Sequence, residues 1–147
     1  MKRFKMIKVI NLLMLALLFL SCKSEKEKND FYGTKTNVNQ SSIERGKLVY
    51  NDLCITCHMA DGKGAEKVFP PLANSDFLKN NQTQSIKAIK YGMSGEIIVN
   101  GVVYNSVMAP LGLIDEEVAD VMNYINNAWG NKIDNWVTPE IVSKIDK

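Results

Sequence analysis

Cys54-Ile55-Thr56-Cys57-His58 is the stretch that decides the fold, because it brings two cysteines together with the single histidine of the chain. The spacing C-x-x-C-H is typical of covalent haem attachment. On a helical turn Cys54 and Cys57 point to the same side, where each sulfur can form a thioether with one haem vinyl group. His58 then lies beneath the iron as one axial ligand. The motif therefore predicts one covalently bound haem c.

Three other kinds of site compete for the same residues. A structural zinc ion needs four ligands, but the chain has one histidine and three cysteines, of which lipidation of Cys22 would leave two free. A thioredoxin-like redox pair follows a strand in a βαβ unit, whereas helical spacing precedes Cys54. A disulfide between Cys54 and Cys57 would leave His58 without a role. These comparisons favour haem.

The second axial ligand must be a different residue type, since no second histidine is present. Methionine partners histidine at haem iron in electron-transfer proteins. Five of the seven methionines are less suitable because they lie in the N-terminal signal, beside His58 or on the apolar face of a predicted helix: Met1, Met6, Met14, Met59 and Met122. Met93 and Met108 lie in loop segments, from which a side chain is freer to reach the iron.

The N-terminal segment predicts export. Residues 1–21 have a basic start and an unbroken apolar run from Leu12 to Leu20, which is shorter than the ~20 residues that span a bilayer. Phe19-Leu20-Ser21 before Cys22 resembles a lipobox, with Phe where Leu is commoner. We expect a lipid anchor at Cys22 on the periplasmic side of a bacterial membrane. The alternative is a retained N-terminal anchor helix, which also places the domain outside the cytoplasm.

The charge of the chain argues against nucleic-acid binding. The formal net charge of the 147 residues is +2, but four basic and no acidic residues precede Cys22. The remaining 14 basic and 16 acidic residues give −2, without the basic stripe that nucleic-acid binding needs.

The composition also predicts the domain boundaries. Residues 22–40 are polar and predict a flexible tether. Residues 41–131 are expected to form one domain, and residues 132–147 a C-terminal tail with one helical turn at most.

Periodicity and turn signals predict a mainly helical domain. Ser41 and Glu44 form a capping-box pattern at the start of a helix that runs into Cys54. Asn100-Gly101 between two short apolar runs predicts a β-hairpin near 97–104. The other expected elements are a loop over 59–74, a short helix over 75–79, a helix over 83–91 ended by Gly92, and a helix over 115–129 ended by Gly130.

These features together resemble a small class I cytochrome c over roughly Ser41 to Asn131. The resemblance is carried, in order, by the haem motif, FPPLANSDFL (69–78), NGVVYNSVMAPLG (100–112) and DEEVADVMNYINNAWGN (115–131). It implies an all-α fold around one haem, with the hairpin as a small insertion. It further implies Met108 as the second axial ligand and a backbone carbonyl near Pro70-Pro71 that accepts a hydrogen bond from His58 Nδ1.

The same resemblance implies contact between the first and last helices near Gly46, Tyr50 and Tyr124. Glycine inside a helix costs ~1 kcal/mol relative to alanine, so close helix approach is a reasonable explanation for Gly46. Two positions depart from the family pattern. Ala109 stands where relatives often have proline, and Ile114 replaces the usual Ser or Thr cap, so we expect Asp115 to cap the last helix. Four aromatic residues are expected to be core rather than haem contacts: Tyr50, Tyr91, Tyr124 and Trp129.

The expected function is single-electron transfer rather than enzyme catalysis. With His58 and Met108 both on the iron, no position remains open for oxygen or peroxide. The expected partners are membrane-associated or periplasmic redox proteins, which the sequence does not identify. An alternative is a haem-based ligand sensor or peroxidase-like enzyme in which Met108 is displaceable. A haem-free thiol oxidoreductase is a third possibility.

Overall fold

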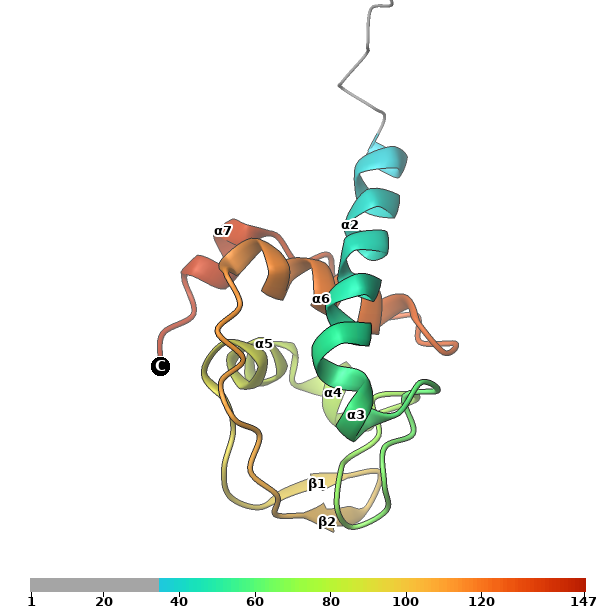
Figure 1. The fold of residues 1–147 in the computed structure, drawn as a ribbon, viewed down its shortest axis with the longest axis vertical. Helices are drawn as coiled ribbons and strands as arrows, with labels where there is room; N and C mark the ends of the chain where they lie inside the picture. Colours follow the sequence, from blue (N-terminus) through green and yellow to red (C-terminus); the bar gives the residue numbers. More distant parts are fainter. Residues whose placement is uncertain (1–34) are drawn as a thin grey trace, which may run out of the picture. The chain divides into compact units, whose positions relative to one another are not determined.

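The computed structural model of the chain describes residues 35–147. The predicted signal, Cys22 and the greater part of the predicted tether lie outside these residues. Within residues 35–147, no helix is both long and apolar enough to cross a membrane. The described part is mainly helical with one two-stranded hairpin, which confirms the expected all-α class with a small β insertion (Figure 1).

A long helical segment carries the haem motif. Helix α2, Lys35–Val49, continues through a π-helical turn, Tyr50–Cys54, into the short helix α3, Ile55–His58. The helix begins before Ser41, so the predicted capping box is wrong, and residues 35–40 of the predicted tether are helical. The neighbouring Ser42 is held by a tertiary contact, since its Oγ donates to Asp120 Oδ1 at 2.5 Å.

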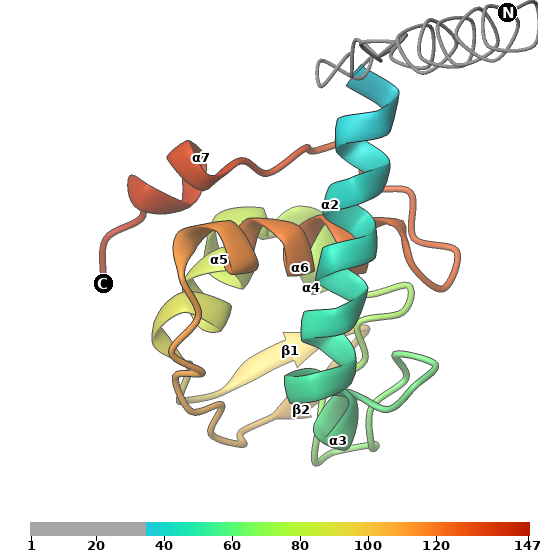
Figure 2. The same cartoon turned by 45° about the horizontal axis from the view of Figure 1, so that its top comes forward.

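Helix α6, Asp115–Asn127, crosses α2 and forms the centre of the core (Figure 2). Gly46 allows the crossing, because a β-carbon at this position would collide with the backbone carbonyl of Asp120. Tyr50 and Tyr124 pack beside it with ring centroids 5.4 Å apart. The expected contact between the first and last helices is confirmed. The buried apolar residues of α6 are Val118, Ala119, Val121, Met122 and Ile125.

The ends of α6 differ from the expectation. Ile114, not Asp115, precedes the first helical residue, and its backbone N–H donates to the Glu117 carboxylate at 3.0 Å. The predicted cap at Asp115 is therefore wrong, because a glutamate one turn into the helix satisfies the free N–H. The helix also ends at Asn127 rather than Trp129, since Ala128 is extended and Trp129 has a positive φ of 52°.

The remaining elements follow the sequence closely. Helix α4 covers Asp76–Asn80, with Ser75 as its N-cap, and helix α5 covers Gln82–Tyr91, with Gly92 as its C-cap. Strand β1, Ile97–Val99, pairs antiparallel with β2, Val102–Tyr104. Asn100 and Gly101 turn between the strands with φ of 51° and 77°, as tight hairpin turns require. A final helix, α7, covers Pro139–Ser143.

The segment after α6 folds back over the core. Val137 and Val142 are buried. Three buried asparagines hold this segment through side-chain hydrogen bonds: Asn123, Asn126 and Asn131. Lys90 Nζ and the Tyr91 hydroxyl donate to carbonyls near its end, those of Val142 and Ile145, at 2.9 Å each. The tail is thus an ordered part of the domain.

Candidate haem-binding site

Two adjoining apolar hollows lie between α3, the hairpin and the loop before α6. The inner hollow is bounded by Cys54, Leu72, Phe77, Met122 and other apolar side chains, and its space free of protein atoms, mouth included, is about 620 Å³. The outer hollow opens toward Cys57, Phe69 and Tyr104 and measures about 500 Å³. The residues that line both hollows are His58, Pro70, Met93, Ile97 and Met108. One group can therefore extend through both hollows and reach both cysteines.

The π-helical turn delivers the motif to these hollows. Tyr50, its first residue, is fully buried against α6, while Cys54, its last, faces the inner hollow. Cys57 lies three residues later on the outer hollow. Cys54 and Cys57 are both free thiols in the structure. Among the described residues no cluster of three or more His, Cys, Asp or Glu could hold a metal ion.

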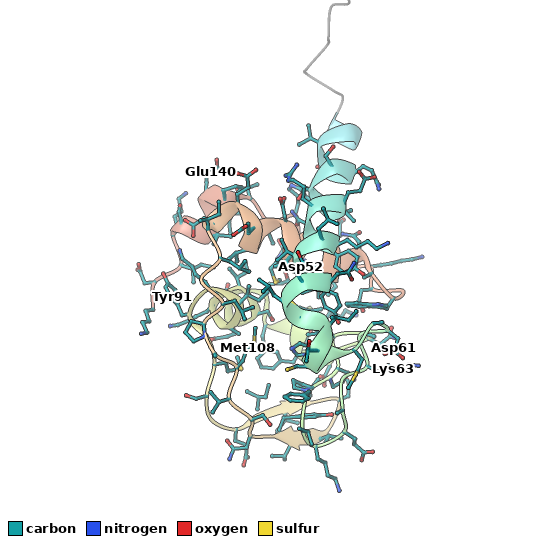
Figure 3. The ribbon with its side chains drawn as sticks, in the orientation of Figure 1. Asp52, Asp61, Lys63, Tyr91, Met108 and Glu140 are labelled. Atoms are coloured by element: carbon teal, nitrogen blue, oxygen red, sulfur yellow. The ribbon has the colours of Figure 1, made fainter. Side chains whose placement is uncertain are left out.

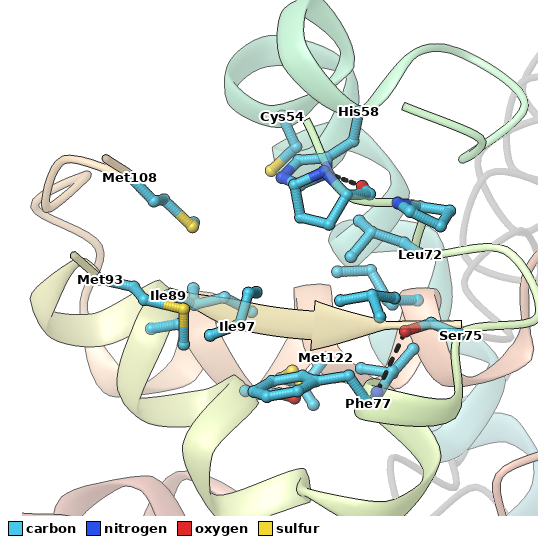
Figure 4. A pocket seen from close by; sticks show the side chains of 17 residues that line it. Cys54, His58, Leu72, Ser75, Phe77, Ile89, Met93, Ile97, Met108 and Met122 are labelled. Carbon is cyan, nitrogen blue, oxygen red and sulfur yellow. Dashed lines mark hydrogen bonds between the residues drawn. The ribbon is translucent and has the colours of Figure 1, made fainter. Parts of the chain in front are cut away.

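His58 is oriented by a backbone carbonyl. Its Nδ1 lies 3.0 Å from the Pro70 carbonyl oxygen. A carbonyl only accepts hydrogen bonds, so Nδ1 carries the proton and Nε2 is the nitrogen left to bind a metal. The expected hydrogen bond near Pro70-Pro71 is confirmed. Figure 4 shows this bond beside Cys54 at one wall of the inner hollow.

The loop after His58 is shaped to present that carbonyl. Gly64 has φ of 62°, and its N–H donates to the His58 carbonyl at 3.0 Å. A β-carbon on Gly64 would collide with the carbonyls of Phe69 and Pro70. Only glycine therefore lets the chain return closely enough over the loop to bring the Pro70 oxygen to His58.

Burial keeps the site uncharged. Burial raises the pKa of Cys54 to about 11, and the neighbouring Cys57 adds to the shift. Burial lowers the pKa of His58, while the Pro70 hydrogen bond opposes this change. The residues that line the two hollows include no Asp, Glu, Lys or Arg. Nearby charges lie outside them, as in the exposed Lys63–Asp61 pair at 3.0 Å at the loop surface (Figure 3).

Met108 lies on the loop between β2 and α6 and faces both hollows, as His58 does. Figure 4 shows its sulfur directed toward the interior from a separate stretch of chain. Met93 enters from the end of α5 and also lines both hollows. Met122 is fully buried on α6 and lines the inner hollow but not the outer one. Met59 is 40% exposed and lies outside them.

The aromatic residues considered as core do not line the hollows. Tyr50, Tyr124 and Trp129 form a cluster behind α3, with ring centroids 4.9–5.5 Å apart. The Tyr50 hydroxyl donates to the Met59 carbonyl at 2.6 Å, and Trp129 Nε1 donates to the Ala60 carbonyl at 2.8 Å. This cluster therefore fixes the start of the loop that follows His58.

Sequence reasoning missed several residues of the lining. Phe69, Phe77, Ile97, Val99 and Tyr104 all border a hollow. Val99 and Tyr104 are the buried inner positions of the hairpin, with 1% and 4% exposure. Every residue of both strands is apolar, so the sequence does not distinguish the inward-facing positions from the outward-facing ones.

Comparison with known proteins gives the family. The profile of the cytochrome c family matches residues 43–129, more than half of the 147 residues. This chain belongs to the cytochrome c family. The expected class I cytochrome c and its fold are thereby confirmed. A cytochrome c of this kind carries covalently bound haem c, one per chain.

Relatives of this cytochrome c include a protein named simply as a cytochrome and cytochrome subunits of dehydrogenases. Cytochrome c-552 from Thermus thermophilus is 40% identical over 83 residues, which cover 53% of this chain and 63% of that protein. The cytochrome c subunit of alcohol dehydrogenase (quinone) from Gluconacetobacter polyoxogenes is 34% identical over 111 residues, covering 73% of this chain and 23% of the subunit. The chain thus spans less than two thirds of the length of either relative.

The side chains around the site of this cytochrome c have the chemistry that haem binding requires. The two hollows adjoin through five shared lining residues, so one group can occupy both. The walls are apolar, a histidine nitrogen is free, and thiol and thioether sulfurs face the same space. Soft sulfur and imidazole are ligands that iron accepts.

Proposed function

We propose that this cytochrome c is a single-electron carrier, with Cys54 and Cys57 bound to haem and His58 and Met108 as the axial ligands. The observation that carries the proposal is the shared lining: His58 and Met108 enter the same two hollows from separate stretches of chain, and each hollow has one cysteine. The arrangement provides two covalent attachment points and two axial donors.

The two thiols serve attachment and the two neutral donors serve coordination. Cys54 lines the inner hollow and Cys57 the outer one, so one group that extends through both can reach both thiols. His58 offers Nε2 because Pro70 holds Nδ1–H. Met108 supplies a thioether, the usual partner of histidine in electron-transferring cytochromes c.

Electron transfer, rather than binding of small molecules, is the function expected when protein side chains fill both axial positions of the iron. Haem c supplies an iron that takes up and releases one electron. Occupation of both axial positions by protein leaves none for oxygen or peroxide. The neutral donors and apolar lining disfavour the added positive charge of the oxidised form and so raise the reduction potential. The packed walls keep the geometry similar in both redox states.

The partners are proposed to be other redox proteins at a membrane. Two of the relatives are named as cytochrome subunits, of an alcohol dehydrogenase (quinone) and of a fructose dehydrogenase. We extend this to the present chain as an electron donor or acceptor role, either free or as a subunit. Lipid attachment at Cys22 on the periplasmic side would hold the domain near such partners.

Haem attachment is tested with cysteine variants made in a host that matures c-type cytochromes. Wild type should keep its haem through denaturing electrophoresis, and the Cys54→Ser, Cys57→Ser double variant should lose it. Cys22→Ser is the matched control: it should keep haem and move from the membrane to the soluble fraction. Haem retention by the double variant would contradict the attachment sites.

Axial ligation is tested by spectra of the ferric and ferrous protein. Wild type should show the far-red methionine-to-iron band and should not bind carbon monoxide without denaturant. Rapid carbon monoxide binding by reduced wild type would instead support the ligand-sensor or peroxidase-like alternative. A colourless protein would eliminate the haem proposal.

A further inference from the structure

The backbones of Met93 and Met108 are paired at the wall that the two hollows share. The Met93 N–H donates to the Met108 carbonyl at 2.8 Å, and the Met108 N–H donates to the Met93 carbonyl at 2.8 Å. They form an isolated antiparallel bridge. Residues directly opposite each other in an antiparallel pair project their side chains to the same face, with β-carbons ~5 Å apart. The two thioethers therefore leave the backbone side by side.

Both side chains lead into the site. Of the four methionines in residues 35–147, only Met93 and Met108 line both hollows together with His58. Both are partly buried. Figure 4 shows the two side chains entering the inner hollow from neighbouring backbone segments. A second thioether is thus present where one axial donor is needed.

We infer that Met93 is a reserve axial ligand, which binds the iron when Met108 leaves it. The inference rests on the proposed ligation by His58 and Met108. The paired backbone holds the two residues in place, so exchange of one sulfur for the other requires rotation about side-chain bonds only. Methionine is unbranched and has three such bonds, which makes this rotation accessible.

The reserve ligand keeps the iron closed to small molecules. Without it, loss of Met108 would open one axial position to carbon monoxide or peroxide. With it, an external ligand binds only in the fraction of molecules in which Met93 is also displaced, and its apparent affinity falls by that fraction. The device preserves electron transfer and suppresses ligand-binding chemistry.

The test compares four holoproteins: wild type, Met108→Leu, Met93→Leu and the double variant. Leucine has nearly the volume of methionine, and such exchanges are well tolerated in apolar surroundings, so the fold is retained. NMR of methyl-labelled methionine in the reduced protein detects the iron-bound methyl through its large ring-current shift. Carbon monoxide titration measures how open the iron is. Met59→Leu, outside both hollows, controls for the exchange itself.

The inference predicts one shifted methyl signal in wild type, and a different one in Met108→Leu that the double variant lacks. Met93→Leu should retain the wild-type signal. Met108→Leu should bind carbon monoxide at least ~10-fold more weakly than the double variant.

Two results would overturn the inference. If wild type shows its signal but Met108→Leu matches the double variant in both measurements, Met93 does not bind the iron and the proposed ligation stands. If the wild-type signal is absent, or is lost in Met93→Leu, the proposed Met108 ligation fails together with the inference.

Discussion

Asn123 pairs with Val137 through both ends of its side-chain amide. The Val137 N–H donates to Asn123 Oδ1 at 2.9 Å, and Asn123 Nδ2 donates to the Val137 carbonyl at 2.9 Å. The two residues are 1% and 2% exposed. A side chain of α6 thus gives the following segment the hydrogen bonds that a neighbouring strand would provide. This segment lies beyond the family match, which ends at residue 129.

Asn123→Ala should destabilise the domain by about 2–4 kcal/mol, because it leaves both polar backbone groups of Val137 buried and unpaired. Chemical denaturation of the holoprotein measures the free energy of unfolding. Asn127→Ala is the matched control, since Asn127 is exposed and its Nδ2 donates to a single carbonyl, that of Asn123. Equal losses in the two variants would show that the pairing with Val137 contributes nothing.

Asp120→Asn should cost about 1–3 kcal/mol in stability. Asp120 is only 5% exposed. Its carboxylate accepts hydrogen bonds from Arg45 Nε at 2.6 Å, Arg45 Nη2 at 2.9 Å and Ser42 Oγ at 2.5 Å. Hydrogen bonds to a charged group contribute more than those to a neutral one. Thermal unfolding monitored by far-ultraviolet circular dichroism provides the measurement.

Glu116→Gln serves as the control for Asp120→Asn. Glu116 lies 3.9 Å from Arg45 Nη2 and its side chain is 61% exposed. Exposed pairs of this kind contribute little, so the change should be within ~0.5 kcal/mol. A larger effect for Glu116→Gln than for Asp120→Asn would reverse our ranking of the two acids.

Gly46→Ala should lower stability although alanine is the better helix former. The propensity gain is at most ~1 kcal/mol, whereas the added methyl group collides with the Asp120 carbonyl and approaches the Tyr124 β-carbon to 2.9 Å. We expect a net loss of about 1–3 kcal/mol from overpacking. Lys47→Ala, at the next and exposed position of α2, should be nearly neutral. A gain in melting temperature for Gly46→Ala would contradict the close packing.

Gly64→Ala should weaken the hydrogen bond between His58 and the Pro70 carbonyl, because the new methyl group displaces the Phe69–Pro70 backbone. Loss of this acceptor makes the imidazole a poorer electron donor, so the reduction potential should rise. The Nδ1–H resonance of His58 in the reduced protein reports the bond directly.

Gly112→Ala separates backbone strain from collision. Gly112 has φ of 72°, close to the 62° of Gly64, but nothing lies within 4 Å of an added β-carbon. It should therefore lose only the ~1–2 kcal/mol of a left-handed non-glycine residue, with an unchanged potential. A shift of potential in both variants would assign the effect to strain alone.

The elements with local signals were predictable from the sequence. Asn100-Gly101 between two short apolar runs predicted a tight turn, so the hairpin was placed correctly. Gly92 ended α5 as expected. The hydrogen bond from His58 to Pro70 was also expected, through the family resemblance.

The features that depend on distant partners were not predictable. Ser42 belongs to a network with Asp120, 78 residues away, and no local rule distinguishes this role from capping at Ser41. Asn123 and Asn126 are polar residues that the periodicity left unassigned, yet both are 1% exposed. The bridge between Met93 and Met108 likewise joins residues whose proximity only the tertiary fold creates.

The π-helical turn Tyr50–Cys54 sets the rotational phase of the haem motif relative to the core. A π turn contains one residue more than the α-helical turn it replaces, and one residue corresponds to ~100° of rotation. Deleting a residue here would restore a regular helix and swing Cys54, Cys57 and His58 away from the hollows while Tyr50 stayed anchored. A transplant of the haem motif into another helix would therefore need the whole segment 50–58. Residues 54–58 alone, on a regular helix, would point their side chains in a different direction.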